Sequence, residues 1–271
     1  MIAALPMYDR EQTAAAHDAF WEALREELRA GGVAAPERLS RGGDLWSAWQ
    51  SPDLLLGQVC SLPYRMRLHG HVMLLGTADY GLPDAPAGHY YSYFVVRAGE
   101  DRALAAHAGR RFACNEWISH SGWVAAQMGA ELAGCAFTAA YETGSHWQSA
   151  HDVAEGAADI AAIDAISWRI IEEHAPQVSA RLQILGRTPA SPGQAFICAP
   201  RMDAAGMRAA LGRVIASGAG APLGIGGLVD IAAPAYCELP IPQGLARGAP
   251  RRAGMGAQTP EDAGLRPAGA D

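Results

Sequence analysis

The chain has 271 residues, half of them hydrophobic, and a formal net charge of −7 at pH 7. This charge argues against a nucleic-acid partner, because a phosphate backbone is bound by a basic stripe. All 21 lysine-or-arginine positions hold arginine, which excludes Schiff-base chemistry, pyridoxal phosphate anchoring and the lysine of a P-loop.

The first half of the chain alternates predicted strands with a helix. Apolar runs predict strands over residues 2–7, 53–60, 71–77 and 90–97, and an amphipathic pattern predicts a helix over 13–29. A second group of elements follows, with strands over 110–116 and 135–141, a loop over 118–122 and a helix over 123–132. Strands alternating with helices favour an α/β fold with mostly parallel sheets.

The stretch YETGSHWQSAHDVAEGAADIAAIDAISW, residues 141–168, carries the clearest local signals. Ser145 is an expected N-cap, and a helix is predicted from His146 to Gly156, where glycine tolerates the left-handed conformation. The apolar run IAAID predicts a strand buried on both faces, with Asp164 at its carboxyl end. Because ligands bind at that edge of an open α/β sheet, Ser145, His146 and Asp164 form a candidate recognition site.

The rest of the chain predicts a helix over 166–174, strands over 182–185 and 195–199, and a helix over 203–217. The order of elements predicts one lobe made of residues 1–94 and 187–242, with a second lobe, 95–186, inserted between them. Two crossing segments would form a hinge, with a ligand cleft between the lobes. Residues 243–271 are rich in Gly, Pro, Ala and Arg without periodicity, and predict a disordered tail.

Export, membrane and metal signals are weak. The start MIAALPMYDRE lacks a basic n-region, and no stretch approaches the roughly 20 apolar residues that span a bilayer. We therefore expect a cytoplasmic protein without membrane insertion, or a periplasmic one if the start is misassigned. Five cysteines without a CxxC pair predict reduced buried thiols, and neither a metal nor a cofactor is expected.

Five segments together resemble a known family. They are LPMYDR, LLLGQVCSLPYR, YYSYFVVR, NEWISHSGW and ETGSHWQSAHDVAEGAADIAAID. Their order over residues 1–240 resembles the PhnD-like phosphate, phosphite and phosphonate substrate-binding proteins of ABC transporters. The resemblance implies a type 2 periplasmic-binding fold, a small oxyanion ligand, an ABC permease as partner and no catalytic residue.

The resemblance also implies site residues. The SxSG loop holds phosphonate oxygens in the family, and Ser119, Ser121 and Gly122 occupy that pattern here. The histidine after the GS pair is His146, and the acid that ends the ADIAAID strand is Asp164. Two aromatic residues of the first lobe are expected to line the cleft, Tyr64 in the SLPY turn and Tyr8 after the first strand.

Each of these residues also has an ordinary structural explanation. Ser119, Ser121 and Asp164 could be simple helix caps, His146 could be a solvent-facing residue of the first helical turn, and the two tyrosines could be core residues. An enzyme on the same fold, of the pyrimidine-precursor or menaquinone-pathway type, is a second hypothesis, with His146 and Asp164 as an acid/base pair. A ligand sensor that signals lobe closure to a protein partner is a third.

Overall fold

The computed structural model describes residues 1–241, and the tail predicted for 243–271 lies outside these described residues. The chain divides into two compact units. Unit 1 comprises Met1–His89 and Pro192–Leu239, and unit 2 contains Tyr90–Ser191. The short strands β4 (His89–Tyr90) and β10 (Ser191–Pro192) pair with each other and contain the residues at which the chain passes from one unit to the other.

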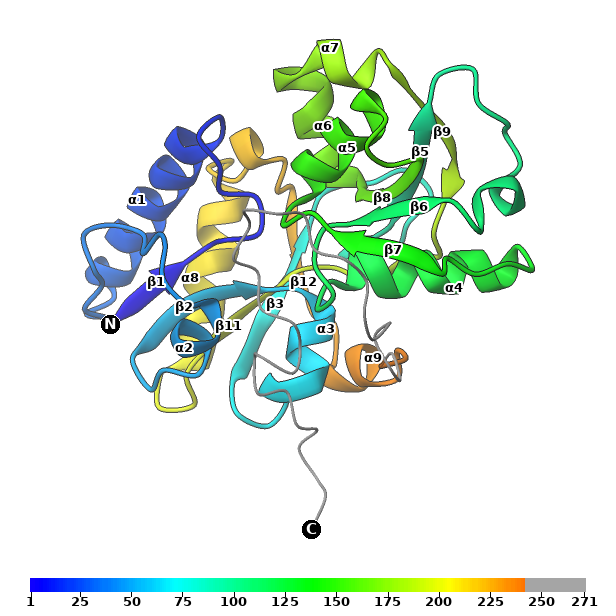
Figure 1. Ribbon diagram of the computed structural model, residues 1–271. Helices are drawn as coiled ribbons and strands as arrows, with labels where there is room; N and C mark the ends of the chain where they lie inside the picture. The colour runs from blue at the N-terminus through cyan, green and yellow to red at the C-terminus, as the bar shows by residue number, and fades with distance from the viewer. Residues whose placement is uncertain (242–271) are drawn as a thin grey trace. The chain divides into compact units, whose positions relative to one another are not determined.

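Unit 1 is built on a five-stranded sheet in the order β1-β2-β11-β3-β12. Its strands are β1 (Ile2–Ala4), β2 (Leu54–Val59), β3 (Met73–Asp79), β11 (Ala195–Cys198) and β12 (Gly227–Val229). Its helices are α1 (Ala14–Ala30), α2 (Leu45–Trp49), α3 (Ser61–Pro63), α8 (Ala204–Ala216) and α9 (Ala233–Cys237), with a π-helical turn at Tyr64–Leu68 and a 3-10 turn at Ala221–Leu223. The long helices α1 and α8 pack against one another (Figure 1).

Unit 2 is built on a second five-stranded sheet, in the order β7-β6-β8-β5-β9. Its strands are β5 (Ser92–Arg97), β6 (Arg111–Cys114), β7 (Ala139–Glu142), β8 (Ile160–Asp164) and β9 (Leu182–Arg187). Its helices are α4 (Ala125–Leu132), α5 (His146–Glu155), α6 (Ala165–His174) and α7 (Pro176–Ser179), with a 3-10 turn at Leu104–His107 and a π-helical turn at His120–Val124.

Both faces of the unit 2 sheet are covered, which explains its continuous apolar strands. Side chains of β5 alternate, so that Val95 packs against Val153 of α5 and the neighbouring helices. Phe94 points to the other face, where its ring lies 5.8 Å from that of Phe137. Helices α5, α6 and α7 cover one face and α4 the other (Figure 1).

The α/β class is confirmed, but the sheets are mixed rather than mostly parallel. Within residues 1–241, the parallel pairs are β1 with β2, β6 with β7 and β6 with β8. Antiparallel pairs join β11 to β2 and β3, β12 to β3, and β5 to β8 and β9. The sequence cannot show this, because a strand buried on both faces has the same apolar run in either direction.

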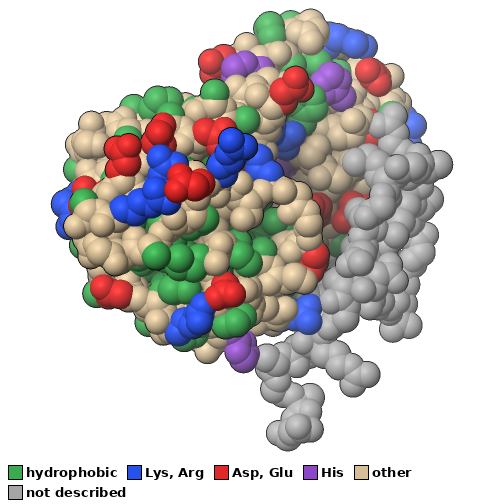
Figure 2. All heavy atoms as spheres, turned by 90° about the vertical axis from the view of Figure 1, so that its left-hand side faces the viewer, with side chains coloured by type: hydrophobic (Ala, Val, Ile, Leu, Met, Phe, Trp, Pro, Cys, Tyr) green, Lys and Arg blue, Asp and Glu red, His purple; other side chains and the backbone are tan. Residues whose placement is uncertain are grey.

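Charges of both signs lie side by side over the face of unit 1 that carries α1 (Figure 2). Arg25 pairs with Glu22 of the same helix, and Arg41 pairs with Asp18 at 2.8 Å. Arg213 of α8 reaches Glu27 of α1. In the described chain this face therefore presents paired charges, not the basic stripe that a nucleic acid requires.

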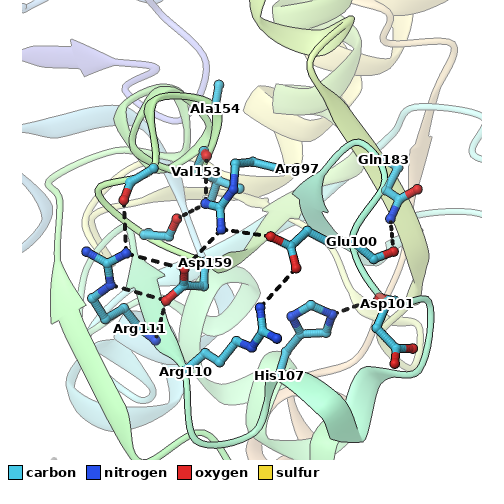
Figure 3. A network of polar contacts seen from close by, with 12 residues as sticks. Arg97, Glu100, Asp101, His107, Arg110, Arg111, Val153, Ala154, Asp159 and Gln183 are labelled. Atoms are coloured by element: carbon cyan, nitrogen blue, oxygen red, sulfur yellow. Dashed lines mark hydrogen bonds and ion pairs between the residues drawn. The ribbon is translucent and has the colours of Figure 1, made fainter.

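An ion-pair network closes one edge of the unit 2 sheet, where β6 and β8 begin and β5 ends (Figure 3). Asp159 lies 3.0 Å from Arg97 and 3.1 Å from Arg111. Glu100 in turn contacts Arg97 and Arg110. Burial acts to raise the pKa of Asp159, but the hydrogen bonds from Arg111 and Arg97 outweigh it and lower this pKa to about 2.

This network should make stability depend on pH. Because the folded-state pKa of Asp159 lies below the ordinary 3.8, its contribution is present above about pH 4 and is lost as the pH falls towards 2. Asp159→Asn should lower the free energy of unfolding by about 1 kcal/mol at pH 7, a modest value because solvent screens the partly exposed arginines. Urea unfolding at pH 7, 4 and 2.5 measures this, with the exposed Glu155→Gln as control. If Asp159→Asn and the parent chain differed as much in free energy of unfolding at pH 2.5 as at pH 7, the lowered pKa of Asp159 would not be the source of this stability.

Candidate functional site

The opposite edge of the unit 2 sheet gathers the polar residues predicted from the sequence. Strands β6, β7 and β8 run parallel and end together, with Cys114 beside Glu142 and Ala113 beside Ala161. The segments that follow them begin with Asn115, Thr143 and Ala165. Strand β5 runs the other way, so its first residue, Ser92, pairs with Asp164, the last residue of β8. This edge is where open α/β sheets bind ligands.

The SxSG loop turns into α4 through a π-helical turn rather than directly into an α-helix. Ser119 caps this turn, and its hydroxyl oxygen accepts a hydrogen bond from the Gly122 amide at 3.1 Å. The Val124 amide reaches back to the Ser119 carbonyl at 3.4 Å, five residues away. The Ser92 hydroxyl donates to the Ser121 carbonyl at 2.9 Å and ties the turn to the sheet. Isolated π-turns inside helices occur frequently at functional sites.

A side chain at residue 122 would collide with its neighbours. A Cβ atom at this position would lie 1.8 Å from Asn115 Oδ1 and 3.2 Å from His146 Cε1. Asn115 is the first residue after β6. Its main-chain carbonyl accepts a hydrogen bond from the Gly144 amide, in the loop after β7, at 2.7 Å. The absence of a side chain at residue 122 therefore lets the SxSG loop approach both Asn115 and His146.

His146 is the first residue of α5 and lies next to the SxSG loop. Ser145 caps α5, and its hydroxyl oxygen accepts from the Gln148 amide at 3.1 Å, as predicted. This cap places the imidazole so that Nε2 lies 2.8 Å from the Ser121 hydroxyl oxygen. The Ser121 and Ser119 hydroxyl oxygens are 3.3 Å apart. Two hydroxyls and one imidazole thus form a continuous, buried hydrogen-bonded chain.

Asp164 joins this chain from the end of β8. Its carboxylate caps α6, accepting from the amides of Ile166 and Ser167, and it also accepts from the Ser167 hydroxyl at 2.5 Å. The second carboxylate oxygen lies 3.3 Å from His146 Nε2. Asp164 is therefore both the helix cap considered from the sequence and a neighbour of the predicted imidazole.

Comparison with known proteins identifies the family. The family described as ABC transporter, phosphonate, periplasmic substrate-binding protein matches residues 2–217. The chain belongs to this family. No curated protein sequence is similar enough to this chain to count as a match. The expected resemblance to phosphonate-binding proteins is thus confirmed.

Solved structures with the same fold include two phosphonate-related proteins. PhnD1 from Prochlorococcus marinus in complex with methylphosphonate is 15% identical, with a TM-score of 0.66 over 87% of this chain and 94% of that one. A binding-protein component of an ABC phosphonate transporter from Pseudomonas aeruginosa is 15% identical, with a TM-score of 0.61 over 87% and 82%. A Xanthomonas citri protein bound to chloride ion is also 15% identical, with a TM-score of 0.67 over 88% and 94%. These matches show the two-lobed periplasmic-binding fold.

The geometry at the imidazole differs from that of a catalytic triad. In a Ser-His-Asp triad the serine and the carboxylate contact different ring nitrogens, so that a proton can pass through the ring. In this phosphonate-binding family member, Ser121 and Asp164 both lie at Nε2 of His146. This arrangement agrees with the family assignment, which makes the chain a transport protein and not an enzyme.

The two predicted tyrosines belong to unit 1, whereas the residues described above belong to unit 2. The Tyr8 ring packs edge-on against Tyr80 at 5.5 Å. The Tyr64 ring packs against Tyr236 at 5.3 Å, and its hydroxyl lies 3.2 Å from His69 Nδ1. Burial, and secondarily the nearby Cys237, raises the pKa of Tyr64 to about 12. Both rings are buried, and their role as ligand contacts stays a prediction.

Several residues of this edge were not predicted. Ser92 interrupts the apolar run of β5. Asn115 follows β6 directly, at the carboxyl end of the strand, where ligands bind in open α/β sheets. Glu116 and Glu142 form an acidic pair, and Glu142 accepts from the amide of Trp117, just before the SxSG loop, at 2.9 Å. Burial, with the charge of Glu142 added, raises the pKa of Glu116 to about 7. Only Ser92, a polar residue inside an apolar run, carried a signal that the sequence could have shown.

Residues 1–241 contain no helix that is both long and apolar enough to cross a bilayer. The same residues contain no group of three or more His, Cys, Asp or Glu side chains arranged to hold a metal ion.

Proposed function

We propose that this family member binds a phosphate- or phosphonate-like oxyanion at the carboxyl edge of β6, β7 and β8 and delivers it to an ABC permease. The observation that carries this proposal is the chain of polar side chains from Ser119 through Ser121 to His146. Hydroxyl and imidazole groups can donate hydrogen bonds to several oxygens of one tetrahedral anion.

The helices support the same ligand. Helix α5 and the helix formed by the π-turn and α4 begin at this edge, beside His146 and Ser121 respectively. The first amides of a helix lack partners within the helix, and the helix dipole favours an anion there. An oxyanion at this edge would receive hydrogen-bond donors from both segments.

A titration series tests the proposal. Calorimetry with phosphate, phosphite, methylphosphonate and 2-aminoethylphosphonate should show micromolar or tighter binding for at least one of them. Ser121→Ala should weaken that binding by about 10- to 100-fold, because a hydrogen bond to a charged group contributes about 1.5–3 kcal/mol. Ser179→Ala is the matched control, because Ser179 is a partly exposed serine of α7 whose hydroxyl donates only to the nearby Pro176 carbonyl among the bonds described. Heat from none of the four anions, or equal affinity in Ser121→Ala, would argue against the proposal.

We also propose that the protein works in the periplasm, as the family description states for its members. Delivery to a permease requires the binding protein on the outer side of the inner membrane. Fractionation of cells that express the chromosomal gene from its native start tests this. Recovery only with cytoplasmic markers would favour the cytoplasmic location expected from the first residues of the chain.

A further inference from the structure

A carboxylate beside an anion site presents an electrostatic problem. Asp164 is only 2% exposed and lies 3.3 Å from His146, yet an ionised carboxylate repels an oxyanion. One solution is that the acid receives a cationic group of the ligand, such as an ammonium. The hydrogen bonds of Asp164 point to a different solution.

The acceptor positions of Asp164 are already occupied by its own unit. Oδ1 accepts from the Ile166 amide at 3.1 Å and from the Ser167 amide at 3.0 Å. Oδ2 accepts from the Ser167 hydroxyl and lies beside His146 Nε2. A carboxylate offers about four acceptor positions. These four donors fill that capacity, so the carboxylate has little left to offer a ligand ammonium.

The contact with His146 has a directional consequence. An ionised carboxylate only accepts hydrogen bonds, so the ring nitrogen that faces it, Nε2, carries a hydrogen. The one hydrogen on Nε2 is then shared between Asp164 Oδ2, 3.3 Å away, and the Ser121 oxygen, 2.8 Å away, so Nε2 is a donor towards Ser121. The Ser121 hydroxyl hydrogen must therefore point away from the ring, towards the Ser119 hydroxyl or towards a bound anion.

We propose that Asp164 is a positioning residue, which keeps the hydrogen of His146 on Nε2 and thereby makes the Ser121 hydroxyl a donor to the ligand. This inference rests on the proposed function and narrows its ligand class. The site recognises the oxygens of a phosphate or phosphonate group, and Asp164 does not contribute affinity for an ammonium on the ligand.

Asp164→Asn tests this with two matched ligands. 2-Aminoethylphosphonate and propylphosphonate have the same number of heavy atoms and differ in an ammonium against a methyl group. Asparagine caps helices as well as aspartate, so α6 keeps its cap while the contact with His146 changes. We expect the affinities for both ligands to fall by a similar factor, about 10-fold, corresponding to one weakened hydrogen bond. A selective loss for 2-aminoethylphosphonate would overturn the proposal.

Two further measurements separate positioning from general damage. Nitrogen-15 NMR of histidine-labelled protein should show the His146 hydrogen on Nε2, and Asp164→Asn should shift it towards Nδ1; His146→Gln assigns the signal. Asp203→Asn alters a cap of α8 that lies in unit 1, and should leave affinity and the His146 signal unchanged. A hydrogen on Nδ1 in the wild-type protein overturns the proposal even if no tested ligand binds, whereas failure of binding alone contradicts only the proposed function.

Discussion

Gly122→Ala should lower the affinity for the oxyanion that binds best by about 100-fold. The new Cβ would lie 1.8 Å from Asn115 Oδ1, so either the Asn115 side chain or the SxSG loop must move. Movement of the loop breaks the Gly122 to Ser119 hydrogen bond and separates Ser121 from His146. Two hydrogen bonds to a charged ligand, each of about 1.5 kcal/mol, correspond to this loss.

A double variant makes this prediction specific. Asn115→Ala removes the side chain that the new methyl group would strike, so Gly122→Ala with Asn115→Ala should regain part of the affinity. Gly109→Ala is the control, because a Cβ at that exposed glycine meets no atom within 4 Å. Calorimetry of the four proteins gives the comparison. Wild-type affinity in Gly122→Ala, or no regain in the double variant, would show that the close approach at residue 122 does not position the donors.

Phe112→Ala should cost about 3–5 kcal/mol of unfolding free energy, the usual range for removing a buried aromatic ring. The Phe112 side chain is fully buried in β6, stacked on Phe137 at 4.5 Å and edge-on to Trp123 at 6.1 Å. Trp123 belongs to the π-turn that carries Ser121, so the cavity left by Phe112 would also loosen the proposed anion site.

Urea unfolding followed by tryptophan fluorescence measures the loss of unfolding free energy. Leu132→Ala is a suitable control, because Leu132 is 79% exposed at the end of α4 and its truncation should change stability by less than about 0.5 kcal/mol. If Phe112→Ala lost less than about 1 kcal/mol of unfolding free energy, the side chains around residue 112 would have collapsed into the cavity, against this prediction. Weaker ligand binding without any loss of stability would also contradict the packing argument.

Local signals predicted the elements around the site well. Ser145 caps α5, and Gly156 ends it in the left-handed conformation with φ of 83°, because serine and glycine favour these positions for reasons that do not depend on distant contacts. The strand IAAID and the position of Asp164 at its carboxyl end were also confirmed. Caps and buried strands are short-range features, so a single sequence suffices to find them.

Contacts that depend on strand direction and register could not be predicted. Ser92 faces Asp164 only because β5 runs antiparallel to β8, and an apolar run does not reveal direction. The π-turn at His120–Val124 was predicted as a loop followed by a helix. A hydrogen bond between residues five apart, here from the Val124 amide to the Ser119 carbonyl, produces no recognisable pattern of apolar residues in the sequence. The alternatives considered for Asp164 were not exclusive, because one carboxylate both caps α6 and contacts His146.

The pairing of β5 with β9 has a consequence for protein engineering. These strands bring the chain into unit 2 and out of it, and they lie next to each other, with the Thr188 amide bonded to the Ser92 carbonyl at 2.8 Å. A segment whose ends meet in this way can be excised or transplanted with a short linker. Residues 90–191 would then carry Ser119, Ser121, His146 and Asp164 together, as a half-receptor that can be grafted into a reporter protein.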